Sequence, residues 1–350
     1  MNYQNCVSLA RNHMMFNSNM EAEIHRISYC CTDEAKNIQI ILCDDPEETL
    51  SNYYARKKEI LDESKRLAQS TGQSDNPYYL ACTRCPVFEC KDWGEESDLI
   101  HFICFNATPA PCQAKCFYCS QNLENRRKYD KEKDAPGYDL IFKHIEYFRD
   151  KGLFAENIHW DISAGEITIH PLKEKLYELV GNASAAWLTN CYVYSEQIGN
   201  NLANSKRSYI LFSMDSGTPK TWQKIKGSDN FEAVKETVRK YKAVASNPSQ
   251  QIILKYIILP GINDDIKNIS KFITFVGESG FKRIVVARDR WSKNPKENVE
   301  GASTILAFCA ISGIVPDFNF FHPQEMEEIK EIAKRKANSL MQSMNGKAVN

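Results

Sequence analysis

Short apolar runs alternate with longer amphipathic segments from about Asp98 to Asn319. In the longer segments apolar residues recur three and four positions apart, as in helices that bury one face. The short runs have the length and composition of strands. Strands that alternate with helices are typical of βα units around a parallel sheet, so the pattern predicts an α/β fold, specifically a partial (β/α)6-type TIM barrel. The predicted strands are Leu99–Phe105, Ile158–Ile162, Ala185–Leu188, Ser208–Phe212, Gln251–Ile258, Arg283–Ala287 and Gly313–Asp317.

Outside this region the pattern changes. Residues 1–97 show two short strand-like pieces, Glu23–Tyr29 and Asn37–Leu42, and a charged helix at Glu47–Gln69, which predict a small cysteine-rich α+β module. Residues 322–350 contain a polar helix, Glu325–Met344, with Pro323 near its start. The expected organisation is therefore a module at 1–97, a barrel at 98–321, and a closing helix and tail at 322–350.

Composition narrows the classes of partner. The chain has 44 Lys and Arg residues against 45 Asp and Glu residues. It therefore lacks the excess of positive charge that would indicate a nucleic-acid partner. The sequence has neither an apolar run of membrane-spanning length nor the order of a secretory signal, which predicts a cytoplasmic protein without a membrane partner. Glycine-rich nucleotide-binding motifs are also missing from the sequence.

Clustered cysteines carry the strongest chemical signal. Of 13 cysteines, seven fall between Cys82 and Cys119, and a reducing compartment makes metal binding a better account of such clustering than disulfides. Cys112, Cys116 and Cys119 have a Cys-x3-Cys-x2-Cys spacing. A cubane cluster takes four cysteines, so three would leave one iron open to a ligand. A zinc loop that borrows a fourth ligand is the alternative.

This spacing, with Tyr118 directly before the third cysteine, resembles the signature of the radical S-adenosylmethionine (radical SAM) superfamily. The resemblance implies a [4Fe-4S] cluster on the three cysteines and S-adenosylmethionine as the second cofactor. It also implies an electron donor such as flavodoxin or ferredoxin, reductive cleavage to a 5′-deoxyadenosyl radical, and abstraction of a substrate hydrogen.

Later segments, each at the end of a predicted strand, extend the resemblance. Gly165 and Glu166 lie in a stretch that is similar to the family's Gly-Gly-Glu-Pro motif, with Ala164 and Ile167 as departures. The resemblance implies that this turn contacts the methionine amino group; a solvated loop carboxylate is the alternative for Glu166. The other implied cofactor contacts are Tyr118, Asn190, Ser213 and Asp215.

Two of these segments leave alternatives open. Asp215 could instead cap a helix. Cys191 stands where relatives often carry glycine; it is a candidate catalytic hydrogen-atom donor, with a buried apolar thiol as the alternative.

A second cysteine group, Cys82-x2-Cys85-x4-Cys90, precedes the first predicted barrel strand. With Cys30 or Cys31 as fourth ligand, and Cys43 as the next choice, it predicts a closed auxiliary [4Fe-4S] cluster or a zinc site. The arrangement resembles the auxiliary-cluster modules called SPASM or twitch domains, although here the module would precede the barrel.

The function that the sequence predicts is radical SAM catalysis on a small polar substrate, such as a sugar, cyclitol or antibiotic intermediate, with oxidation, epimerisation or dehydration as the outcome. Peptide modification by a maturase is the alternative within the same class. The alternative from another class is a non-enzymatic iron-sulfur or zinc protein that acts as a redox sensor or scaffold.

Overall fold

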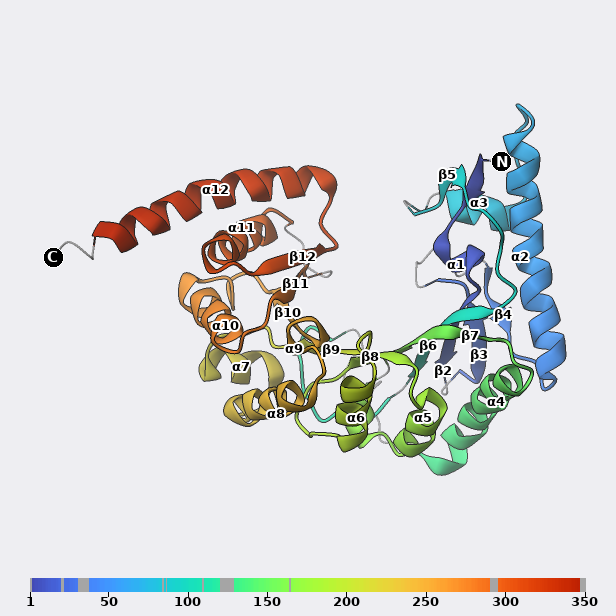
Figure 1. The fold of residues 1–350 in the computed structure, drawn as a ribbon, viewed down its shortest axis with the longest axis horizontal. Helices are drawn as coiled ribbons and strands as arrows, with labels where there is room; N and C mark the ends of the chain where they lie inside the picture. Colours follow the sequence, from blue (N-terminus) through green and yellow to red (C-terminus); the bar gives the residue numbers. More distant parts are fainter. Residues whose placement is uncertain are drawn as a thin grey trace. The chain divides into compact units, whose positions relative to one another are not determined.

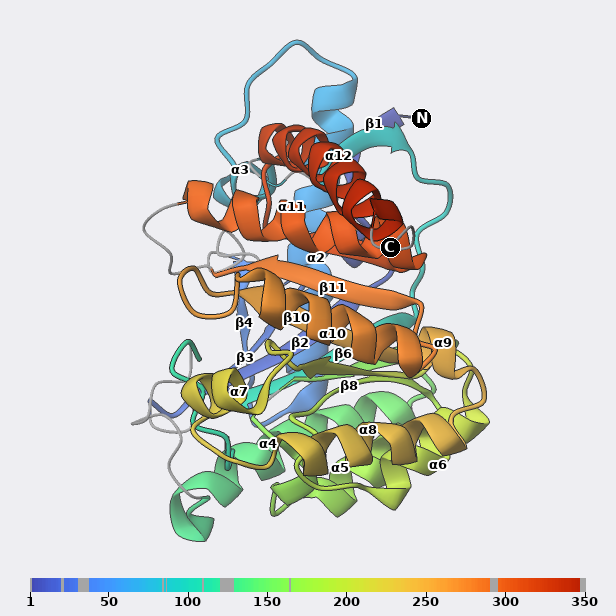
Figure 2. The same ribbon diagram turned by 90° about the vertical axis from the view of Figure 1, so that its left-hand side faces the viewer.

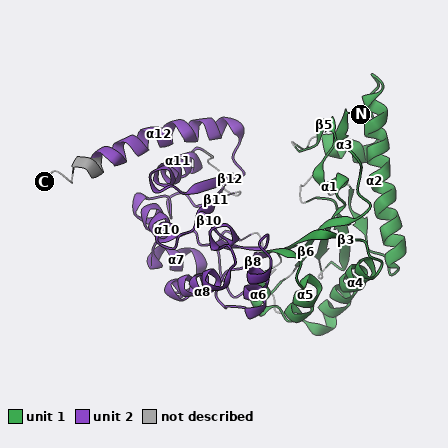
Figure 3. Cartoon of the chain, viewed as in Figure 1, with its two compact units in different colours: residues 1–111, 125–186 green, residues 112–124, 187–350 purple. Residues whose placement is uncertain are grey.

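A computed structural model describes residues 2–19, 22–30, 38–83, 85, 87–108, 110–119, 129–163, 165–289 and 295–346. The chain forms two compact units, which Figure 3 colours separately. Unit 1 comprises residues 1–111 and 125–186, and unit 2 comprises residues 112–124 and 187–350. The boundary passes through strand β8, Ser184–Leu188. Cys31 lies outside the described residues.

Unit 1 has its main strands in the order β7-β6-β2-β3-β4 (Figure 1), with β7, β6 and β2 parallel and the pairs β2/β3 and β3/β4 antiparallel. The parallel pair β2/β6 runs from His13 opposite Phe102 to Asn19 opposite Thr108, and β3 returns antiparallel beside β2. A separate antiparallel pair joins β1 to β5. The elements are β1 Asn2–Asn5, α1 Val7–Ala10, β2 His13–Asn19, β3 Ile24–Ser28, β4 Ile40–Ile41, α2 Pro46–Ala68, α3 Pro77–Thr83, β5 Glu89–Asp92, β6 Ile100–Thr108, α4 Lys131–Asp150, β7 Phe154–Ile162, η3 Ile167–Ile169 and α5 Lys173–Val180.

Unit 2 continues the βα pattern with the strand order β12-β11-β10-β9, all parallel. In this unit α10 packs against α11, and α11 packs against α12 (Figure 2). The elements are α6 Glu196–Asn204, β9 Tyr209–Ser213, α7 Pro219–Lys226, α8 Phe231–Val244, α9 Pro248–Gln251, β10 Ile252–Ile258, α10 Ile266–Glu278, β11 Arg283–Arg288, α11 Pro295–Ser312, β12 Val315–Asn319 and α12 Pro323–Gly346.

The sequence at both ends of helix α7 explains where this helix begins and ends. It begins where the Thr218 side chain accepts a hydrogen bond from the Thr221 N–H, with Pro219 in the first turn. It ends at Gly227, whose φ of 65° is left-handed and therefore suits glycine. Trp222 and Lys226 lie four residues apart and are both buried, so they share the inward face.

The α/β class and the mostly parallel sheet agree with a partial TIM barrel, as predicted. Each predicted barrel strand corresponds to an observed one, with ends shifted by a few residues. Strand β2 was not predicted, because its sequence HMMFNSN does not alternate regularly between apolar and polar. Its pairing with β6 makes the N-terminal segment part of the same sheet. None of the described helices has the length and hydropathy that a membrane-spanning segment requires.

Candidate functional site

The loop that carries Cys112, Cys116 and Cys119 belongs to unit 2, where the end of helix α7 holds it. The N–H of Lys115 donates to the carbonyl of Lys226 (3.0 Å). A Cβ at Gly227 would lie 2.9 Å from the Cβ of Lys115, closer than ordinary side-chain contacts allow. Because the last turn of an α-helix leaves carbonyls without intrahelical partners, this helix end is a natural acceptor for loop N–H groups. The cysteine loop is therefore held by backbone groups.

A buried ion pair lies under the same loop. The ammonium of Lys226 is 2.6 Å from the Oδ2 of Asp215, and both side chains are almost fully buried. Lys226 also donates to the hydroxyl of Tyr118 (2.6 Å), and that hydroxyl donates to Asp215. Burial alone would lower the pKa of Lys226, but the nearby Asp215 and Cys116 outweigh it and raise that pKa. A permanent positive charge therefore lies near the Cys116 thiol.

Asp215 is also tied to the neighbouring strand. Its Oδ1 accepts a hydrogen bond from the Ile257 N–H (2.7 Å), and its backbone carbonyl accepts one from the Asn263 side chain (2.8 Å). The alternative that Asp215 caps a helix is wrong, because Thr218 is the cap of α7. Its partner, Lys226, was not among the site residues predicted from the sequence. The sequence feature that could have indicated Lys226 is its position four residues after Trp222, which places both side chains on the same buried face of the helix.

Asn190 connects the end of β8 to the cysteine loop. Its side-chain amide donates to the Sγ of Cys112 (3.7 Å) and to the Oε1 of Gln113 (3.3 Å). Cys191 follows with a φ of 57°, a left-handed conformation that glycine adopts more readily than other residues. The Cys191 side chain is fully buried, which favours the apolar-thiol alternative over hydrogen-atom donation. Ser213 ends β9 opposite Lys255 of β10.

The donor set of the loop fits an iron-sulfur cluster. Three partly exposed thiols lie within eight residues, the amide of Asn190 reaches one of them, and the ammonium of Lys226 favours thiolate at Cys116. Within the described ranges, no three His, Cys, Asp or Glu side chains are already arranged to hold a metal ion, and this includes the triplet.

Gly165 and Glu166 belong to unit 1. Gly165 has a φ of 60°, and a Cβ there would lie 2.6 Å from the Cβ of Ala110, so only glycine fits. The N–H of Glu166 donates to the carbonyl of Pro111, the residue before Cys112 in the chain (2.9 Å). The Oε1 of Glu166 accepts hydrogen bonds from the Thr168 N–H (3.1 Å) and hydroxyl (2.7 Å). Because Glu166 is fully buried, the alternative of a solvated loop carboxylate is wrong.

The second cysteine group is divided in the structure. Cys82 and Cys85 form a turn, in which the N–H of Cys85 donates to the carbonyl of Cys82 (2.9 Å). Cys90 lies on β5, opposite Gln4 of β1, and is exposed. Cys30 is partly buried, and so is Cys43.

One face of the sheet in unit 1 is polar toward the carboxyl ends of its parallel strands. Asn17 and Asn106 are register partners on β2 and β6, and the amide of Asn106 donates to the Oδ1 of Asn17 (3.2 Å). Arg26 on β3 is the cation of this region and donates to Gln39 (2.5 Å). The cavity here has a volume of about 250 Å³ and is lined by Asn17, Ser18, Asn19, Ile24, Arg26, Gln39 and Asn106.

Asp161, the register partner of Cys104, predicts a pH dependence of stability. Burial raises the pKa of Asp161 from 3.8 to about 6, and the hydrogen bond with Ser163 opposes this only in part. Between these values the folded state holds a proton that the unfolded state releases, so the free energy of unfolding falls as pH rises. We expect Asp161→Asn to remove this fall. Urea titrations measure the free energy of unfolding of the variant and of the wild type below pH about 4 and above pH about 6. The difference between the two free energies should be larger at the higher pH. A difference in the free energy of unfolding that stays the same at both pH values would contradict the raised pKa of Asp161.

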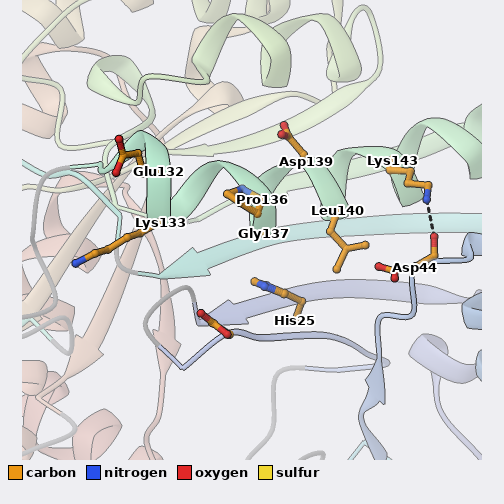
Figure 4. Close-up of a pocket in the computed structure, with 10 residues that line it drawn as sticks. His25, Asp44, Glu132, Lys133, Pro136, Gly137, Asp139, Leu140 and Lys143 are labelled. Carbon is orange, nitrogen blue, oxygen red and sulfur yellow. Dashed lines mark hydrogen bonds between the residues drawn. The ribbon is translucent and has the colours of Figure 1, made fainter.

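A larger cavity, of about 1040 Å³, lies between β3 and the start of α4 in unit 1 (Figure 4). His25 and Leu140 face it, and the ammonium of Lys143 donates to the backbone carbonyl of Asp44 (2.6 Å). Burial lowers the pKa of His25, so its imidazole is neutral near pH 7. None of the motif residues lines this cavity, so size alone does not mark the reactive site.

Comparisons with known proteins bear on the family. Residues 110–273 match the model of the radical SAM superfamily. No curated protein sequence matches the chain. Among solved structures, SuiB from Streptococcus suis is similar with a TM-score of 0.48 and 15% identity, over 79% of this chain and 62% of SuiB.

Two further structures are similar over most of this chain. A radical SAM methyltransferase from Sphaerobacter thermophilus has a TM-score of 0.42 and 10% identity, over 60% of this chain and 63% of that protein. The hydrogenase maturase HydG from Carboxydothermus hydrogenoformans has a TM-score of 0.43 and 14% identity, over 66% of this chain and 56% of HydG. The chain thus spans less than two thirds of these proteins, and likenesses this distant assign it no substrate.

Proposed function

We propose that this chain, whose residues 110–273 match the radical SAM superfamily, is an enzyme of that superfamily that cleaves S-adenosylmethionine reductively and removes a hydrogen atom from a small polar substrate. The observation that carries the proposal is the cysteine loop. Three thiols lie on one loop that backbone hydrogen bonds tie to the end of α7, beside a buried lysine. Three ligands suit a cluster that must keep one iron open for a second cofactor.

The residues of the chain have separable tasks in this proposal. Cys112, Cys116 and Cys119 would hold the [4Fe-4S] cluster. When bound and supplied with an electron by a donor such as flavodoxin or ferredoxin, the cluster provides the electron that breaks a carbon–sulfur bond of S-adenosylmethionine. Lys226 holds positive charge near Cys116 and thereby favours the thiolate form that an iron ligand requires.

The predicted contacts of S-adenosylmethionine are Tyr118, Gly165, Glu166, Asn190, Ser213 and Asp215. Their geometry suggests two kinds of role. Gly165 permits a close backbone approach, and Asn190 reaches the cysteine loop. Asp215 and Tyr118 instead form hydrogen bonds with each other and with Lys226, and Asp215 also accepts one from the neighbouring strand. We therefore infer that these two residues position the loop.

The polar cavity of unit 1 supports a small substrate. Among the residues that the structure describes, amide side chains from two adjacent strands and one guanidinium line it, without a carboxylate. Such groups donate hydrogen bonds to hydroxyl, carbonyl or anionic oxygens. A volume of about 250 Å³ suits a compact, oxygen-rich molecule such as a sugar or cyclitol.

Anaerobic reconstitution tests the proposal. The full chain, loaded with iron and sulfide, is mixed with dithionite and S-adenosylmethionine, and 5′-deoxyadenosine is measured by chromatography. We expect slow formation without substrate and faster formation when a peptide-free filtrate of small metabolites is added. Stimulation only by a peptide fraction would favour the maturase alternative. No 5′-deoxyadenosine from cluster-loaded protein would favour a sensor or scaffold and overturn the proposal.

A further inference from the structure

A cavity of about 660 Å³ lies between α7 and the start of α10 in unit 2. Two lysines of each helix line it, and all four are exposed: Lys220, Lys224, Lys267 and Lys271. Within the part of the chain that the structure describes, none of the four forms an ion pair. Asp265, the carboxylate of this cavity, caps α10 by accepting the N–H of Asn268 (3.0 Å). The cavity therefore carries a net positive charge at neutral pH.

The two helices that carry these lysines are fixed against each other (Figures 1 and 2). A Cβ at Gly217, just before α7, would lie 2.1 Å from the carbonyl oxygen of Asn268 and 2.6 Å from the backbone nitrogen of Phe272, so the close approach to α10 requires glycine. The hydroxyl of Thr218 donates to the side-chain oxygen of Asn268 (3.0 Å). The backbone therefore holds like charges together on one surface, although they repel each other.

The other end of α7 joins this surface to the cysteine loop. Lys224 directly precedes Ile225, whose carbonyl accepts the N–H of Phe117 (3.4 Å). A Cβ at Gly227 would lie 2.9 Å from the Cβ and 3.7 Å from the Cδ of Lys115, so the stem of this exposed lysine lies along the helix end. Phe117 is 55% exposed. Together five lysines form a lysine surface that reaches the cysteine loop: Lys115, Lys220, Lys224, Lys267 and Lys271.

We propose that the lysine surface, with Phe117 at its end, docks an acidic electron-transfer protein that reduces the cluster of the cysteine loop. The inference rests on the proposed function, since the loop needs an electron only if it holds that cluster. One electron leaves the reduced carrier and enters the cluster, so the carrier is oxidised by one electron, the cluster is reduced by one, and no covalent bond changes. The lysines attract the acidic carrier, and the exposed ring gives an apolar contact beside Cys116.

Charge and position favour this occupant over a nucleic acid. The whole chain has 44 basic against 45 acidic residues, so the positive charge is local, whereas proteins that bind nucleic acid are usually basic over a whole domain. Electron carriers form small, transient interfaces, and opposite charges speed their encounter. The lysine surface ends beside the cysteines, which is where the electron has to arrive.

Stopped-flow reduction of the reconstituted full chain tests the proposal. The probe is reduced flavodoxin, a carrier of negative net charge, and the signal is the loss of the visible absorption that Cys116→Ala protein lacks. Lys220→Glu/Lys224→Glu should lower the second-order rate constant at least ~10-fold at low ionic strength. Added salt should slow the wild type and change this variant little. Lys330→Glu/Lys334→Glu on α12, the matched control with the same change of net charge, should stay within ~2-fold of wild type.

Dithionite separates this inference from the proposed function, because it needs no docking. The cluster of Lys220→Glu/Lys224→Glu should be reduced by dithionite to the same extent as in wild type. An unchanged rate with flavodoxin, or an equal loss in the α12 control, would overturn the docking surface and leave the dithionite reaction intact. Retention of a labelled RNA oligonucleotide that is lost in Lys220→Glu/Lys224→Glu, with flavodoxin reduction unchanged, would also overturn it. A wild-type loop that assembles no cluster would overturn both proposals.

Discussion

Cys116→Ala is expected to reduce 5′-deoxyadenosine formation at least ~100-fold, to the level of protein-free controls. Loss of a direct ligand should exceed the 10–100-fold cost that removing an outer-shell partner typically has. Only two thiols, Cys112 and Cys119, would remain on the loop, too few to hold a cluster. The variant should fold, because Cys116 is partly exposed and the loop is held through backbone groups of Lys115 and Phe117.

The measurement is anaerobic turnover with dithionite after reconstitution, together with the visible absorption of the cluster. Cys43→Ala is the matched control, since Cys43 is a partly buried thiol of unit 1 and lies outside the cysteine loop of unit 2. It should keep wild-type turnover. Cleavage of S-adenosylmethionine at the wild-type rate by reconstituted Cys116→Ala protein would refute the assignment of the loop.

Lys226→Met is expected to lower the free energy of unfolding by about 3–5 kcal/mol. The substitution leaves the carboxylate of Asp215 buried without its ion-pair partner. A buried charge that has lost its partner costs several kcal/mol, whereas an exposed pair contributes about 0–1 kcal/mol. The exposed pair Lys58–Asp62 on α2 supplies the control. Lys58→Met should change stability by no more than ~0.5 kcal/mol.

Urea titration of the metal-free chains gives the comparison. The double variant Asp215→Asn/Lys226→Met should recover part of the loss, because an asparagine can still accept the N–H of Ile257 without burying a charge. Lys226→Met should also retain less iron after reconstitution than wild type, since the positive charge near Cys116 is gone. A loss below ~1 kcal/mol for Lys226→Met, with normal iron content, would show that the pair is unimportant.

Residues close together in the sequence were the ones whose role could be predicted. The α/β class and the mostly parallel sheet follow from apolar periodicity, which depends on neighbouring residues. The Cys112–Cys116–Cys119 spacing predicted the radical SAM family because all three thiols lie on one loop. Strand β2 escaped prediction, because it belongs to the sheet through its pairing with β6, about ninety residues later, and not through its own pattern.

The cysteine loop and the alternation of strands and helices from about Asp98 to Asn319 were therefore predicted from the sequence alone. Tertiary structure decided which distant side chains share an environment. It paired Asp215 with Lys226 and left Cys90 exposed on β5. The physical reason is that spacing along the chain defines contacts only within a turn or a helix. Contacts between elements depend on strand register and helix packing, which form when the whole chain buries its apolar faces.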